Sequence, residues 1–210
     1  MAYAAPPAAP AGGYPVQVTV TDQRELSRWW GIPFFGNLVR WILAIPHLVV
    51  LWILGFVLAF WFFLGWIAIL LTGRVPGIAV RLLTEYIQRG ARVGAYVGFL
   101  MPGGYPPLEP GGTIPVDVRI ELSSLEINRL WGIPIFGFLV RLLVLIPQFI
   151  VLSVLGMVVG LSLVILWIPI LLTGRYPGWA ISLYGALFRY GTRVGAYMLF
   201  LPVPYPPIWF

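Results

Sequence analysis

His47 is the residue most suited to chemistry, because it is the only histidine and follows Pro46 within an apolar run. A neutral imidazole there is a candidate axial ligand for haem or chlorophyll. The chain contains a second copy of the same module, in which Gln148 stands in place of His47 and cannot repeat haem ligation. We therefore favour a histidine that hydrogen-bonds a carbonyl freed by the proline kink.

The carboxylates lie where they cannot serve a membrane pathway. All seven are outside the apolar runs, at Asp22, Glu25, Glu85, Glu109, Asp117, Glu121 and Glu126. Proton and ion pathways use carboxylates inside membrane segments, so a pump or coupled transporter is disfavoured. The chain has no cysteine, and its sequence contains no carboxylate pair, activated nucleophile, phosphate-binding glycine loop or metal-ligand cluster. We predict that the protein is not an enzyme and needs no cofactor.

The 13 basic residues are all arginines, and the net charge is +6. They stand beside apolar runs rather than in a hydrophilic block, so we expect lipid phosphate as the counter-charge and no nucleic acid. A GC-rich genome would also favour arginine over lysine. The arginines predicted to anchor the protein at lipid headgroups are Arg40, Arg74, Arg92, Arg141, Arg175 and Arg193.

The composition is that of a membrane protein. Hydrophobic residues make up 60% of the chain and charged residues 10%, whereas about a quarter of a soluble domain is charged. Residues 1–13 form an Ala/Pro/Gly tract without the basic and apolar regions of a signal peptide. We expect this tract to be a disordered tail.

Residues 14–108 and 114–210 are tandem copies of one module, joined by a linker at 109–113. The copies align at an offset of 100 near their start and of 101 after one inserted residue. On this register Trp30-Gly31-Ile32-Pro33 recurs as Trp131-Gly132-Ile133-Pro134, and Leu71-Thr72-Gly73-Arg74 recurs as Leu172-Thr173-Gly174-Arg175. Matches of this length establish an internal repeat.

Each module begins with alternating apolar and polar residues, which predict a short strand at 16–20 and at 116–120. Because a lone strand is unstable, we expect the two strands to pair with each other or with the Tyr-Pro-Pro segments that close the modules. The sheet would lie outside the membrane.

In each module 33 uncharged residues separate two of these arginines, Arg40 from Arg74 and Arg141 from Arg175. A spanning helix needs only about 20 apolar residues, so each run predicts a transmembrane helical hairpin, with its turn at Gly55 or Gly156. Gly73 and Gly174 are then expected to cap a helix C-terminus, and a following proline to begin the next element.

The last part of each module predicts an amphipathic helix. From Gly77 to Met101, charged residues recur at helical spacing, which favours a helix lying in the membrane interface. The matching helix of the second copy carries fewer charges, so a deeper or spanning position stays open. The predicted fold is mainly α and integral to the membrane, each module having a short strand, a transmembrane hairpin and an interfacial helix.

The hairpins would place the arginines on one side, so the positive-inside rule predicts a multi-pass protein with both termini in the cytoplasm. The rival interpretation has one kinked pass in each module, at Leu48 to Leu71 in the first. It would place the linker and the N-terminus on opposite sides of the membrane.

These motifs resemble a known family. The matching runs are Leu26 to Trp29, Leu43 to Leu51, Leu71 to Arg74 with Pro76, Arg92 with Ala95 and Tyr96, and Tyr105 to Pro107. They resemble the bacterial membrane family catalogued as domain of unknown function 4389, and the resemblance covers both modules. It implies a protein of the bacterial cytoplasmic membrane with no assigned activity, so it supplies no catalytic residues.

Three functions remain as hypotheses. The first is a non-enzymatic scaffold or accessory subunit that packs in a larger membrane protein complex or with copies of itself. The alternative is a lipid-binding or membrane-shaping protein with wedge-like hairpins. The third is pigment or haem attachment through His47.

Overall fold

The computed structural model is mainly helical and contains one two-stranded sheet. It describes residues 13–32, 35–103, 105–106, 116–133 and 135–207, so the predicted tail and the linker at 109–113 lie outside the described residues, apart from Gly13. The elements of the first copy are β1 (Val16–Val20), η1 (Arg28–Gly31), α1 (Phe35–Thr72), α2 (Gly77–Val93) and η2 (Gly94–Gly98). Those of the second are β2 (Val116–Ile120), η3 (Arg129–Gly132), α3 (Phe136–Val144), α4 (Ile146–Thr173) and α5 (Gly178–Met198).

The two predicted strands pair with each other, which confirms one of the expected arrangements. β1 and β2 are antiparallel, with Val18 opposite Val118. Their buried valines face α5 and α2, while their alternate residues form a polar outer face. This outer face consists of Gln17, Thr19, Asp117 and Arg119.

The hairpin prediction is wrong. α1 is a single helix of 38 residues that continues through Gly55, and α4 continues through Gly156. A glycine inside a helix costs only about 1 kcal/mol, whereas a turn would break the internal pairing of backbone groups that an apolar surrounding demands. In the second copy the helix over the described residues 136–173 is interrupted at Leu145, between α3 and α4.

The continuous helix also separates the arginines that were expected to share one side. Arg40 and Arg74 are 34 residues apart, which corresponds to about 51 Å along a helix. They therefore mark opposite ends of α1. Both termini were predicted to be cytoplasmic because hairpins would place the arginines on one side of the membrane. The continuous helix does not support that argument.

The prediction that Gly73 and Gly174 cap the C-termini of the long helices is confirmed. Gly73 and Gly174 both have φ of 68°, and each donates its N–H across 2.8 Å to an isoleucine carbonyl, that of Ile69 or Ile170. Such left-handed residues end helices at little cost only when they are glycines. α2 and α5 begin directly after Pro76 and Pro177, as expected.

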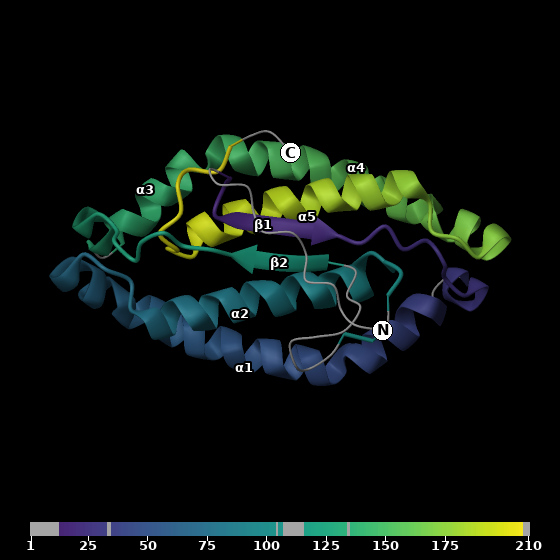
Figure 1. Cartoon of the computed structure of the whole chain (residues 1–210), viewed down its shortest axis with the longest axis horizontal. Coiled ribbons are helices and arrows are strands. Elements are labelled where there is room, and N and C mark those ends of the chain that lie inside the picture. Colours follow the sequence, from purple (N-terminus) through teal and green to yellow (C-terminus); the bar gives the residue numbers. More distant parts are fainter. Residues whose placement is uncertain (1–12, 33–34, 104, 107–115, 134, 208–210) are drawn as a thin grey trace.

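The two copies exchange their N-terminal segments. η1 packs against α4, and η3 packs against α1, so each copy completes the other. The contacts are close: a Cβ on Gly31 would lie 2.5 Å from the backbone nitrogen of Leu171, and one on Gly132 would lie 2.5 Å from that of Leu70. Figure 1 shows the result, with α1 and α4 at opposite edges and the sheet between them.

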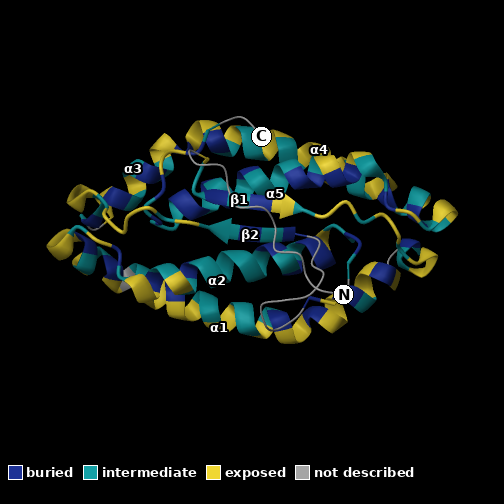
Figure 2. Ribbon diagram, viewed as in Figure 1, coloured by how far each residue is buried: buried dark blue, intermediate teal, exposed yellow. Residues whose placement is uncertain are grey.

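Two helices are long and apolar enough to cross a membrane, the Phe35–Phe62 part of α1 and α4. In their most apolar windows only 17% and 11% of the residues are buried, whereas the core helix of a soluble protein is mostly buried. Figure 2 shows exposed residues along the outer edges of both helices. Large apolar side chains occupy these positions, such as Trp52, which is 73% exposed, and Phe56, which is 69% exposed.

Candidate functional site

Arg40 occupies a buried site rather than a lipid interface. Its side chain is 1% exposed, and its Nη1 donates to the carbonyl oxygens of Tyr96 at 2.8 Å and Met101 at 3.0 Å. The guanidinium carbon lies 4.7 Å from the ring centroids of both Trp30 and Tyr96. A guanidinium held between aromatic rings gains about 1–2 kcal/mol for each such contact once desolvated.

Arg141 repeats this arrangement in the second copy. It is 3% exposed, donates to the carbonyl of Tyr197, and lies 4.9 Å from the ring of Trp131 and 4.3 Å from that of Phe200. This corrects the prediction that Arg40 and Arg141 reach lipid headgroups. Their guanidinium groups donate to backbone carbonyls at the C-terminal ends of α2–η2 and α5 instead. These ends pack against α1 and α3.

The other predicted anchors divide into two pairs. Arg92 bonds to Asp117 of β2 at 3.3 Å and so ties α2 to the sheet, and Arg193 of α5 lies over the ring of Tyr14, just before β1, at 5.3 Å. Arg74 is exposed and pairs with Glu126 at 2.8 Å, and Arg175 is also exposed. Contact with lipid headgroups stays a prediction for Arg74 and Arg175.

His47 is buried and hydrogen-bonds to a loop rather than to the proline kink. Its partner is the carbonyl of Pro106, and its ring lies 4.9 Å from that of Tyr105. Gln148 makes the equivalent bond, donating from Nε2 to the Pro206 carbonyl at 3.0 Å. Both side chains thus fix the Tyr-Pro-Pro segment of their own copy. Haem or chlorophyll attachment stays a prediction, and the described residues include no cluster of metal-ligand type.

Tyr176 links the two copies through the core. Its hydroxyl donates to the Phe99 carbonyl at 2.6 Å. Burial raises the pKa of this hydroxyl, so it remains a neutral donor.

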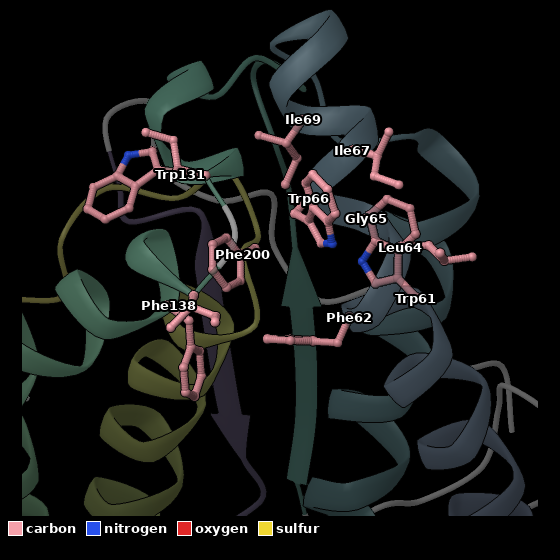
Figure 3. Close-up of a pocket in the computed structure, with 12 residues that line it drawn as sticks. Trp61, Phe62, Leu64, Gly65, Trp66, Ile67, Ile69, Trp131, Phe138 and Phe200 are labelled. Carbon is pink, nitrogen blue, oxygen red and sulfur yellow. The ribbon is translucent and has the colours of Figure 1, made fainter.

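An apolar cavity of about 530 Å³ opens where α1 meets η3 and α3 (Figure 3). One wall is the C-terminal half of α1, and the other comes from the second copy. The aromatic rings that line it are those of Trp61, Phe62, Trp66, Trp131, Phe138 and Phe200. Phe62 meets Phe138 and Phe200 edge to face, with ring centroids 6.0 Å and 5.4 Å apart.

A polar cleft adjoins the same α1–η3 junction. Its lining includes Thr72, Gly73, Arg74, Glu126 and Arg129. Arg129 extends over Gly73, since a Cβ on that glycine would lie 3.2 Å from the Arg129 Nε. The cavity is aromatic and the cleft is cationic, and the two lie a few residues apart along α1 and η3.

Sequence reasoning identified these arginines and aromatic residues but did not bring them together. Trp30, Arg40 and Tyr96 recur as Trp131, Arg141 and Tyr197 at the same offset of 101, and that joint recurrence was the available signal. The cavity had no such signal, because it depends on how the two copies exchange segments.

Comparison with known proteins gives a family without an activity. The model of Domain of unknown function (DUF4389) matches residues 36–107 and 137–209. No curated protein matches the chain, and neither does any solved structure. The two matches cover most of the chain and coincide with the two copies, so the protein belongs to the DUF4389 family and carries its domain twice.

Proposed function

We propose that the protein is a non-enzymatic integral membrane scaffold or accessory subunit, which packs through its sheet face against another copy or another membrane protein. The exposed apolar edges of α1 and α4 support contact with lipid, since surfaces of this size are rare on soluble monomers. The proposed location is the bacterial cytoplasmic membrane.

The observation that carries this proposal is the position of the sheet relative to the length of α1. The middle of α1 packs on α2, where a Cβ on Gly55 would lie 3.7 Å from the Tyr86 ring. Close by on α2, Gln88 donates to the Val118 carbonyl of β2 at 2.9 Å. The polar outer face of the sheet therefore lies level with the middle of the longest apolar helix.

This position is costly if α1 and α4 cross the bilayer. An arginine or aspartate at the centre of a membrane costs about 2.5–3.5 kcal/mol, and Arg119 and Asp117 of the outer face would both lie there. Asp117 is partly neutralised by Arg92 and Arg119, at 3.3 Å and 3.4 Å. A protein partner whose polar groups pair with Arg119 and Asp117 would offset the remaining cost, which is why a packing partner is proposed.

The membrane-shaping alternative depended on hairpin wedges, and α1 and α4 form continuous helices instead. Arginines stand at both ends of the long helices, Arg74 and Arg129 at one end and Arg28 and Arg175 at the other. The positive-inside rule therefore favours neither orientation of the protein in the membrane.

The proposal is tested by the size of the particle extracted in mild detergent. We expect an oligomer or a complex with a second membrane protein. Thr19→Trp on the outer sheet face should dissociate it, whereas Ser123→Trp in an exposed loop should not. A monomer that carries no partner in native membranes and in detergent would contradict the proposal.

A further inference from the structure

We propose that the α1–η3 junction binds one anionic glycerophospholipid, with an acyl chain in the aromatic cavity and its phosphate at Arg129. This inference rests on the proposed membrane location but not on the packing partner. It concerns one specific site and not the general contact of α1 and α4 with lipid.

The cavity has the size and lining of a ligand site. Its volume of about 530 Å³ lies within the usual range of about 300–1,000 Å³ for small-molecule pockets. The lining side chains are apolar, and the rim residues Leu64 and Ile67 remain 41% and 39% exposed. A chain entering from the lipid side therefore meets apolar contacts throughout.

Two of the residues that line the cavity differ between the copies. Gly65 of α1 corresponds to Leu166 of α4, whose side chain is fully buried in the core. The absence of a side chain at Gly65 lets the Trp61 indole lie across it, because a Cβ there would be 2.7 Å from the ring. Trp61 in turn corresponds to Ser162, which bonds to Tyr184 at 2.9 Å. The side chains at these two positions therefore differ in size and in position between the copies.

The polar end supplies the charge for one phosphate. Arg74 is paired with Glu126, whereas no carboxylate among the described residues pairs with Arg129. Two arginines and one glutamate leave a net charge of +1 in the cleft, which matches a phosphodiester. The guanidinium fork of Arg129 suits phosphate oxygens better than a lysine would.

The two parts are spaced for one amphipathic molecule. Ile69 lines the cavity and Gly73 lines the cleft, and four residues of helix separate them by about 6 Å. Phe62 lies deeper, about 16 Å from Gly73 by the same rise. A headgroup at the α1 terminus with a chain running back along the helix satisfies both parts.

The corresponding junction in the other half of the molecule, where α4 meets η1, provides the matched control. Arg28 extends over Gly174 as Arg129 does over Gly73, with its Cγ 3.3 Å from a Cβ built there. It has a cationic corner but Leu166 in place of Gly65. A lipid that binds only through exposed arginines would bind equally at the α1–η3 and α4–η1 junctions.

The experiment is native mass spectrometry of the full chain, delipidated in mild detergent and titrated with phosphatidylglycerol. We expect one tightly held lipid in the wild type. Gly65→Leu, which installs the second copy's residue, and Ile67→Trp at the rim should each weaken this binding about tenfold, as should Arg129→Gln. Arg28→Gln should leave it unchanged.

Further arms distinguish a specific lipid site from binding of free phosphate and from general lipid contact. Inorganic phosphate should not displace the lipid, because it lacks the acyl chain. Equal binding by wild type, Gly65→Leu and Ile67→Trp would overturn the proposal, as would equal loss in Arg28→Gln and Arg129→Gln. Carbonate extraction of membranes containing the same variants separates the two claims. A variant that loses the lipid but stays in the membrane reports on this site alone. Extraction of the wild type by carbonate would refute the membrane location itself.

Discussion

Arg40 holds the end of the α2–η2 segment to α1 through two carbonyl oxygens. Arg40→Met keeps the length of the side chain but leaves both carbonyls without their donor, and each lost partner costs about 1–3 kcal/mol. We expect a destabilisation of roughly 3 kcal/mol, measured by denaturant titration in detergent. Arg81→Met is the control, because Arg81 is exposed. Equal stability of the two variants would show that the buried site contributes nothing.

His47 is expected to be replaceable by the residue of the other copy. His47→Gln should cost less than about 1 kcal/mol, because glutamine makes the equivalent bond at Gln148. His47→Leu should cost about 1–3 kcal/mol, since it leaves the Pro106 carbonyl unpaired. Thermal unfolding measures both. An absorbance band in the purified protein that is lost in His47→Gln would instead support pigment or haem attachment.

At this scale the sequence was informative about residue types and less so about their partners. For Arg40 and Arg141 the sequence predicts lipid contact, because an arginine in an apolar run usually extends to the headgroups. The alternative requires carbonyls from residues more than 50 positions away, those of Tyr96 and Met101 for Arg40. No local pattern reports such contacts.

At the scale of elements, the strands, the glycines that end the long helices and the presence of a helix after each were predicted correctly, while the interfacial position of those helices stays a prediction. Their signals are local: alternation in β1 and β2, and a left-handed glycine before proline. The hairpin prediction was wrong because neither an apolar run longer than the bilayer thickness nor a glycine near its middle determines where a helix ends. Helix length depends on packing, and here η1 and η3 of the opposite copies support the far ends of α4 and α1.

Gly55 tests the continuity of α1. Gly55→Ala should stabilise the protein by about 0.5–1 kcal/mol, since alanine is the better helix former and its Cβ would make only an ordinary contact with Tyr86. In a hairpin turn the same change would destabilise. Gly31→Ala is the contrasting variant, because its Cβ would lie 2.5 Å from the Leu171 backbone nitrogen. Denaturant titration should show opposite signs for the two changes.

At the scale of the whole molecule, the repeat was evident from the sequence but the exchange of segments was not. The two copies form one unit, since η1 lies on α4 and η3 on α1. We therefore expect fragment 14–108 alone to be degraded or aggregated, and fragments 14–108 and 114–210 expressed together to assemble. Co-purification through a tag on one fragment measures this. A stable, monomeric 14–108 fragment would contradict the interdependence of the copies.

The central claim is that α1 and α4 lie in the bilayer while protein covers the polar face of the sheet. The absence of cysteine allows single-cysteine labelling without background. Thr19 is exposed on the outer sheet face, and Ser123 is exposed in the loop after β2. In native membranes treated from both sides with a membrane-impermeant maleimide, Ser123→Cys should react, while Thr19→Cys should react only after the complex is dissociated. Reaction of Thr19→Cys as fast as Ser123→Cys would place the sheet in water and contradict the account.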